Sequence, residues 1–169
     1  MRDRRFIAQH RGGPLPRACH RSLALWAADC AEDVIGLFET QTQDGRPRQA
    51  LAIARAWAEG QVKTGVAMKA AVAAHAAARS VTDAAAIAAA RACGHAVATA
   101  HAADHSMGAL LYAMKALDAA GIDSQAAFHH QIERLPPHLR DQVATGVLSR
   151  VKKISPPPSR EMQWPAEKR

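Results

Sequence analysis

Three histidines and an aspartate lie close together in an alanine-rich segment between residues 94 and 108. The polar residues of this segment are His95, His101, Asp104, His105 and Ser106. Imidazole and carboxylate groups can ligate a metal ion, transfer a proton or bind a polar partner. The surrounding alanines favour a helix and bring no chemistry of their own. We therefore take these five residues as the candidate pocket or partner-binding site.

The geometry of this cluster depends on whether one helix continues through residues 95–105. Each residue turns a helix by about 100°, so a continuous helix would hold His101, Asp104 and His105 within about 60° of one another. His95 would point about 120° away from His101. Two histidines four residues apart, with a carboxylate nearby, could then supply metal ligands. A break in the helix would give a different arrangement, and the spacing alone leaves both open.

We expect a break near residues 103–106. No proline occurs between residues 83 and 120, but a helix of that length would far exceed the mean of about 11–12 residues in globular proteins. Asp104 or Ser106 would cap the following helix, and the histidines would form hydrogen bonds across the joint. The residues favour this structural role first, a pocket or partner-facing surface second, and a metal or catalytic site third.

Sequence signatures of several enzyme classes are absent. The chain has no zinc-protease motif with its glutamate, no glycine-rich phosphate loop and no nucleophile elbow. Its cysteines, Cys19, Cys30 and Cys93, form no Cys-x-x-Cys pair, and their odd number argues against a disulfide framework. We therefore predict a protein that is not an enzyme and that has no cofactor and no bound metal.

The rest of the chain predicts helices only. Apolar residues recur every three or four positions, and no segment alternates as a strand does. We expect helices at about residues 16–38, 47–59, 64–79, 83–103, 106–120, 123–135 and 137–153. A length of 169 residues suits one domain. The prediction is an all-α, single-domain bundle of six or seven helices over residues 16–153, between a basic, extended N-terminal arm (1–15) and a proline-rich basic tail (154–169).

Only 4% of the residues are aromatic, so the core must be built from alanine and aliphatic residues that let helices approach closely. In the helix near residues 64–79 we expect one buried side, formed by Met68, Ala71, Val72, His75 and Ala78. His75 would be a hydrogen-bonded core histidine. Trp164 is isolated in the tail, where it could pack on its own domain or on a second copy of the chain, which makes a homodimer one predicted partner.

The net charge of +7 lies at the two ends of the chain. Residues 1–21 carry six basic and one acidic side chain (+5), and residues 150–169 carry six basic and two acidic side chains (+4), so the remainder carries 7 − 9 = −2. Chain ends seldom form a fixed surface, and aromatic residues for base stacking are few, so we do not expect nucleic-acid binding. The acidic residues Asp29, Glu32, Asp33 and Glu39 predict a solvated face that could engage a basic partner.

Several sequence blocks together resemble a family of small bacterial proteins, the Imm-five-like putative immunity proteins of polymorphic toxin systems. The blocks are residues 5–15 (RFIAQHRGGPL), residues 25–31 (LWAADCA), residues 48–51 (RQAL) up to Trp57, residues 94–101 (GHAVATAH) and residues 103–109 (ADHSMGA). The last two together form the most specific match, and the resemblance covers roughly residues 4–150.

The resemblance implies a cytoplasmic helical protein that binds and neutralises a cognate toxin. The sequence agrees with this compartment, because no segment reads as a signal peptide or a membrane span, and we expect no membrane contact. The alternative is a helical small-molecule or metal-binding domain, enzymatic or not, that uses His95, His101, Asp104 and His105. An immunity protein against a basic nuclease would ordinarily be acidic. The charge of this chain therefore predicts either contact through the mildly acidic body or a toxin of another kind.

Overall fold

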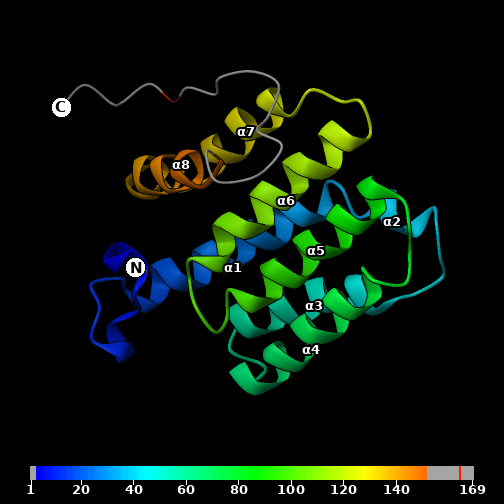
Figure 1. Cartoon of the computed structure of the whole chain (residues 1–169). Helices are drawn as coiled ribbons and strands as arrows, with labels where there is room; N and C mark the ends of the chain where they lie inside the picture. The colour runs from blue at the N-terminus through cyan, green and yellow to red at the C-terminus, as the bar shows by residue number, and fades with distance from the viewer. Residues whose placement is uncertain (1–2, 152–163, 165–169) are drawn as a thin grey trace.

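The computed structural model describes residues 3–151 and residue 164, and this part of the chain is all-helical (Figure 1). Two 3-10 helices, Arg4–Phe6 and Gln9–Arg11, precede α1 (Arg17–Glu32), α2 (Gly36–Glu39), α3 (Arg46–Ala58), α4 (Thr64–Ala77), α5 (Ala84–Ala98), α6 (His105–Ala119), α7 (Ser124–Glu133) and α8 (Pro137–Val151). Within these residues no strand forms, and the one β-type contact is an isolated bridge between Ala8 and Leu15. The predicted all-α bundle is confirmed, with seven longer helices and the single turn of α2.

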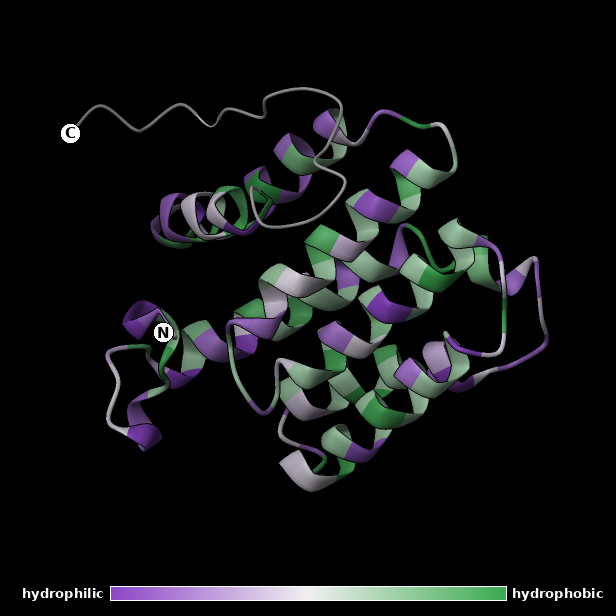
Figure 2. Ribbon diagram, viewed as in Figure 1, coloured by the Kyte–Doolittle hydropathy of each residue, from purple (hydrophilic) through white to green (hydrophobic). Residues whose placement is uncertain are grey.

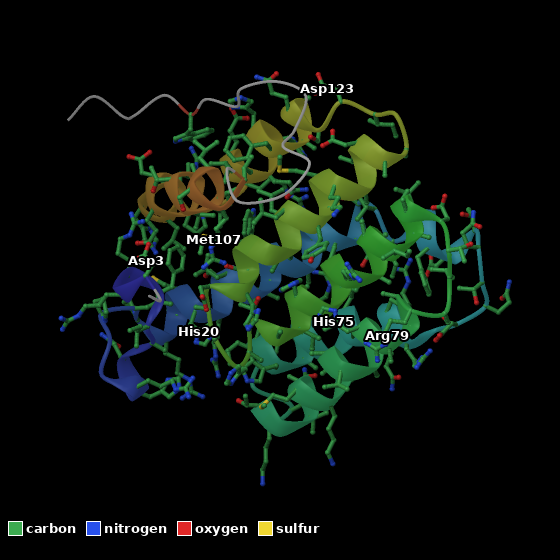
Figure 3. All side chains as sticks on the ribbon, viewed as in Figure 1. Asp3, His20, His75, Arg79, Met107 and Asp123 are labelled. Carbon is green, nitrogen blue, oxygen red and sulfur yellow. The ribbon has the colours of Figure 1, made fainter. Side chains whose placement is uncertain are left out.

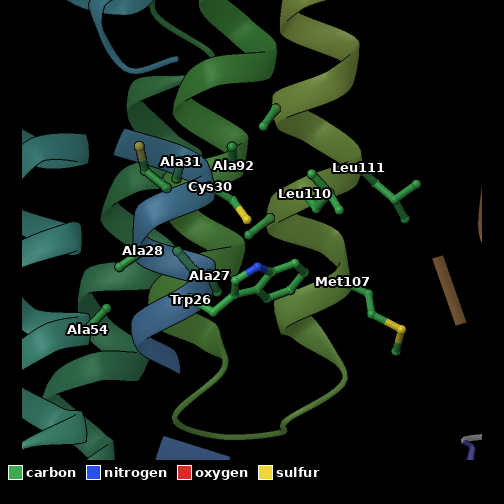
Figure 4. Packing of buried hydrophobic residues seen from close by; sticks show 14 of the residues in the cluster. Trp26, Ala27, Ala28, Cys30, Ala31, Ala54, Ala92, Met107, Leu110 and Leu111 are labelled. Carbon is green, nitrogen blue, oxygen red and sulfur yellow. The ribbon is translucent and has the colours of Figure 1, made fainter. Parts of the chain in front are cut away.

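Helix α5 lies at the centre of the bundle. It packs against α1, α3, α4 and α6, while α7 and α8 pack on α6. Alanine covers most of the buried surface of α5, so its neighbours approach closely, and the apolar colours of α5 and α6 in Figure 2 follow this composition. Trp26 of α1 is the large side chain between α1 and α6, near Leu110 (Figure 4). None of the described helices has the length and apolar character needed to cross a membrane.

The predicted helix over residues 16–38 is divided in two. α1 ends at Glu32, a turn follows, and α2 begins at Gly36. Val34, Ile35 and Phe38 are all buried in the core. On one continuous helix these three residues would lie on the apolar side of α1, so helical periodicity alone does not reveal the turn.

Two predicted helix starts are confirmed by capping hydrogen bonds. The carboxylate of Asp83 accepts a hydrogen bond from the backbone N–H of Ala86 (2.8 Å) at the start of α5. Asp123 likewise accepts from Gln125 N–H (2.9 Å) at the start of α7. Gly121 follows α6 with a φ of 75°, a left-handed conformation that favours glycine. The sequence predicts these helix starts correctly because a capping hydrogen bond involves only neighbouring residues.

The buried side of α4 differs from the prediction. Met68 and Val72 are 46% and 68% exposed, whereas Ala67, Ala71, Ala74 and Ala77 are buried. α4 packs against α3 and α5. At this close approach only small side chains fit, so the larger apolar residues of α4 face outward and the alanines face the core.

The N-terminal segment is not an extended arm. Its two 3-10 helices are joined by hydrogen bonds from Gln9 N–H to the carbonyl of Leu15 (2.9 Å) and from Leu15 N–H to the carbonyl of Ile7 (3.0 Å). Phe6, Ala8 and Leu15 are buried, and Phe6 and Leu15 belong to the main core. Figure 1 shows the segment beside the start of α1. These three buried apolar residues therefore anchor the otherwise basic segment to the bundle.

Trp164 packs on its own chain. Its indole N–H donates a hydrogen bond to Asp141 Oδ1 of α8 (3.1 Å), and its ring stacks on His129 of α7 with centroids 5.8 Å apart. The remainder of the predicted tail, residues 154–163 and 165–169, lies outside the described residues. Because the indole is used within the chain, it supplies no free docking group, and the homodimer stays a prediction.

We expect Phe6→Ala to lower the free energy of unfolding by about 3–5 kcal/mol, because truncating a buried aromatic ring leaves a cavity. Arg4→Ala in the same 3-10 helix changes an exposed residue and should alter stability by less than about 0.5 kcal/mol. Urea denaturation followed by circular dichroism measures both values. A loss for Phe6→Ala no larger than that for Arg4→Ala would show that the N-terminal segment unfolds independently of the core.

Candidate functional site

The candidate residues lie around a turn between two central helices. α5 ends at Ala98 and α6 begins at His105, so the predicted break is present, but it begins at residue 99 rather than near residue 103. The turn is tightly held: the hydroxyl of the buried Ser106 donates to the carbonyl of Ala103 (2.6 Å). His101 and His105 therefore do not share one continuous helix.

Neither predicted capping residue caps α6 with its side chain. Asp104 has helical backbone angles (φ −70°, ψ −12°) rather than the extended ones usual at a capping position. Its carboxylate Oδ2 instead accepts a hydrogen bond from Arg150 Nη2 of α8 (3.1 Å), and its carbonyl accepts one from Arg150 Nη1 (2.9 Å). Asp104 thus ties the turn to α8, a contact between residues 46 positions apart.

Three histidines from three successive helices form a row, which we call the histidine row: His75 of α4, His95 of α5 and His105 of α6. The ring centroids of His75 and His95 are 5.3 Å apart, and those of His95 and His105 are 5.5 Å apart. The Nδ1 atoms of His95 and His105 lie 3.3 Å apart, so one ring donates a hydrogen bond to the other. Tyr112 of α6 stacks on His95 at 4.9 Å. Figure 3 labels His75, the member of the row that the predicted site does not include.

Two glycines make room for two of these rings. A β-carbon added to Gly94 of α5 would lie 2.6 Å from Cε1 of His75, and one added to Gly108 of α6 would lie 2.6 Å from Nδ1 of His95. Each ring therefore occupies the space of a missing side chain on the next helix. Glycine is unfavourable inside helices. Its presence at these two positions is the sequence signal that could have indicated close contacts here.

Partial burial keeps two members of the histidine row, His75 and His95, uncharged at neutral pH. It lowers the pKa of His95 to about 3, and the nearby His105 and His75 add to the effect. The pKa of His75 is also lowered, by burial first and then by Arg91. Arg91 lies over the ring of Tyr112, 6.0 Å from its centroid. Within the described residues, no group of three or more histidine, cysteine, aspartate or glutamate side chains is arranged to hold a metal ion. The geometry is that of a packed joint between helices.

A pocket opens on the other side of the turn, between the N-terminal segment and α1. It has a volume of about 160 Å³ and is lined by Phe6, Ile7, Ala8, Arg11, His20, His101, Ala102 and Ala103. Nε2 of the buried His20 lies 2.6 Å from the carbonyl oxygen of Thr99, and Arg11 Nη1 donates to the carbonyl of His101 (3.1 Å). Figure 3 shows His20 near the N-terminal segment. Sequence reasoning missed Arg11 and His20, because the fold brings them to the turn from about 90 and 80 positions away.

The five predicted site residues thus have different environments. His95 and His105 are adjacent in the histidine row, and His101 lines the pocket, with its ring 6.3 Å from that of His105. Asp104 pairs with Arg150, and Ser106 is buried inside the turn. The turn brings these residues near one another, but their side chains do not converge on one site.

The acidic face of α1 and α2 is neutralised within the protein. Arg48 of α3 pairs with Glu32 and Glu39. Asp29 pairs with Arg55 of α3 (2.6 Å) and with Arg134 at the end of α7 (3.1 Å). These carboxylates therefore hold neighbouring helices together rather than presenting an uncompensated negative surface.

Comparison with known proteins identifies one family. A family model described as Imm-5 like putative immunity protein matches residues 14–138, which is more than half of the chain. No curated protein and no solved structure matches the chain. The matched range includes the histidine row, the turn between α5 and α6, and the start of α8.

We expect Gly94→Ala and Gly108→Ala each to lower the free energy of unfolding by about 1–3 kcal/mol, because the added methyl group displaces an imidazole ring in a close-packed joint. Alanine's higher helix propensity, worth about 1 kcal/mol, would otherwise favour the variants. Gly65→Ala in α4 is the matched control, since its β-carbon meets nothing within 4 Å. Chemical denaturation measures the free energy of unfolding of the three variants. If all three changed it by the same amount, the assigned contact between the rings and the glycines would be wrong.

The stability of the protein should fall as the pH drops below about 6.5, the ordinary pKa of histidine in an unfolded chain. The unfolded chain then binds a proton that the folded state, with the pKa of His95 at about 3, does not bind. One such group changes the free energy of unfolding by up to about 1.4 kcal/mol per pH unit. His95→Phe keeps an aromatic ring against Tyr112 but does not titrate, so its stability should fall less steeply.

Denaturation between about pH 5 and 6.5, where most carboxylates remain ionised, measures these slopes. The difference in the free energy of unfolding between the two proteins at pH 8 gives the packing cost of the substitution. This cost is independent of pH. Parallel curves for the wild type and His95→Phe would rule out the neutral state of His95 as a source of the pH dependence.

Proposed function

We propose that this chain, which belongs to the Imm-5 like putative immunity protein family, protects a bacterial cell by binding and neutralising a cognate toxin of a polymorphic toxin system in the cytoplasm. The observation that carries the proposal is the family match over residues 14–138, which spans α1 to α7. Toxin binding, the bacterial source and the compartment are what the proposal adds to this match.

Neutralisation by binding, rather than by catalysis, is the form of activity that we propose. The polar side chains around the turn take part in packing and in hydrogen bonds that hold helices together. His75 and His95 are shielded from water enough to stay neutral, and Arg150 fixes Asp104 from α8. A rigid surface of this kind loses little conformational entropy on binding, which favours affinity for a protein partner.

We infer that the toxin contacts the end of the bundle that carries the turn between α5 and α6. His101, Asp104 and His105 are partly exposed there, whereas Ser106 is fully buried. The exposed residues would touch the toxin. His95 and Ser106 would hold the turn from beneath, through the histidine row and through the bond to Ala103.

The charge distribution supports a toxin that is not strongly basic at its contact surface. The carboxylates of α1 and α2 are paired with Arg48, Arg55 and Arg134. Near the turn the charged side chains include Arg11 and Arg150. Complementary potentials speed association, so a neutral or acidic toxin surface fits this end of the protein better than a basic nuclease does.

We expect co-expression with the product of an adjacent toxin gene to restore growth, and the two proteins to co-purify. His101→Glu should weaken the complex about tenfold or more, because it places a negative charge at the proposed contact. His130→Glu, an exposed position on α7 away from the turn, is the matched control and should bind as the wild type does. Growth assays and surface plasmon resonance with a catalytically inactive toxin measure these effects.

Absence of both protection and complex formation would refute the immunity function. A complex that forms normally with His101→Glu would refute only the assigned contact surface.

A further inference from the structure

We propose that the pocket between the N-terminal segment and the turn from α5 to α6 binds a small organic carboxylate. Its volume of about 160 Å³ is below the roughly 300–1,000 Å³ typical of sites for drug-sized ligands. A cavity of about 150 Å³ is known to hold a benzene molecule. The pocket therefore fits a group the size of an amino-acid side chain.

The lining of the pocket selects for a negative charge next to an apolar body. Phe6, Ile7 and three alanines provide the apolar wall, and Arg11 provides the charged group. No aspartate or glutamate is among the lining residues. An apolar pocket with a single guanidinium fits an acid whose carbon skeleton lies against the wall while its carboxylate reaches the arginine.

Arg11 is held in position without being neutralised. One of its five N–H groups donates to the carbonyl of His101, which orients the guanidinium toward the turn. No ion pair joins it to a carboxylate within residues 3–151 and 164, in contrast with Arg5, Arg46 and Arg48, which all pair with acidic side chains. Its remaining N–H groups are available for the paired hydrogen bonds by which arginine recognises a carboxylate.

The two histidines of the pocket add polarity to the wall. Because the carbonyl of Thr99 can only accept a hydrogen bond, His20 carries its proton on Nε2. Burial lowers the pKa of His20, so at neutral pH its ring is uncharged and does not compete with Arg11 for the carboxylate. His101 is partly exposed and lines the same pocket.

The pocket walls are rigid. The N-terminal wall is closed by the hydrogen bonds between Leu15 and the backbone of Ile7 and Gln9. A β-carbon on Gly13 would lie 2.0 Å from the carbonyl oxygen of Ile7, so the two backbone segments touch. On the other wall, Ala102 and Ala103 are buried in the turn. A pocket that exists before the ligand arrives loses little entropy on binding.

A carboxylate of this size has two sources: a free small acid, or an aspartate or glutamate side chain of another protein. Both present the same chemistry to Arg11. Benzoate represents the free acid, and N-acetyl-L-glutamic acid α-amide represents the side chain. Benzamide, which has the size of benzoate but no charge, tests whether charge is required.

The experiment is a titration of the full-length protein with these three compounds, followed by NMR of the backbone amides of Ala102 and Ala103. We expect saturable shifts with benzoate or with the glutamate derivative, and much weaker binding of benzamide. Arg11→Gln should weaken carboxylate binding about tenfold or more, the value of a charge-assisted hydrogen bond. Ala102→Leu, which fills the pocket, should abolish binding.

Arg17→Gln is the matched control, because this arginine is exposed at the start of α1 and does not line the pocket. Thermal unfolding without ligand confirms that each variant is folded. Tighter binding of benzoate assigns the pocket to a free acid, and tighter binding of the glutamate derivative assigns it to a protein side chain. No saturable shift with either acid, equal binding of benzamide, or unchanged binding by Arg11→Gln would overturn the proposal.

Discussion

The contact of imidazole rings with glycine holds α4, α5 and α6 together, and the rest of the structure depends on it. His75 lies over Gly94 and His95 lies over Gly108, each ring filling the space of an absent β-carbon. Helices made mostly of alanine can approach closely, but a ring fits between them only where the facing residue is glycine. The same contacts partly shield the rings from water, and this lowers the pKa of His95 to about 3. One packing arrangement therefore sets the helix spacing and keeps His75 and His95 uncharged.

Two segments far from the turn in sequence, the N-terminal segment and α8, hold the turn between α5 and α6 in place. Arg150 of α8 holds Asp104 on one side, and Arg11 of the N-terminal segment holds the carbonyl of His101 on the other. Arg11 and Arg150 thus have defined hydrogen-bond partners in the fold. In the same way, the arginines of α3 and α7 neutralise the carboxylates of α1 and α2. The acidic residues of α1 and α2 are therefore paired within the described part of the fold, whereas Arg11 has no ion pair there.

The two sides of the turn have different chemistry. On one side the half-buried histidine row is joined by a hydrogen bond and ring contacts, as expected for a structural joint. On the other side a small pocket has an apolar wall and one guanidinium without an ion pair among the described residues. Membership of an immunity-protein family and this rigid, polar end of the bundle support binding as the activity.

Local patterns in the sequence were enough to determine the helical class, most helix boundaries and the break before His105. Helical periodicity, N-terminal aspartates such as Asp83 and Asp123, and prolines and glycines at helix ends act over a few residues. The resemblance carried by residues 94–109 also predicted the family. Only the tertiary structure showed that His75 joins His95, that Asp104 pairs with Arg150 instead of capping α6, and that Met68 and Val72 face outward. It alone brought Arg11 and His20 to the turn. These features depend on which helix surfaces meet, and in a chain so rich in alanine the apolar pattern of a single helix does not specify that choice.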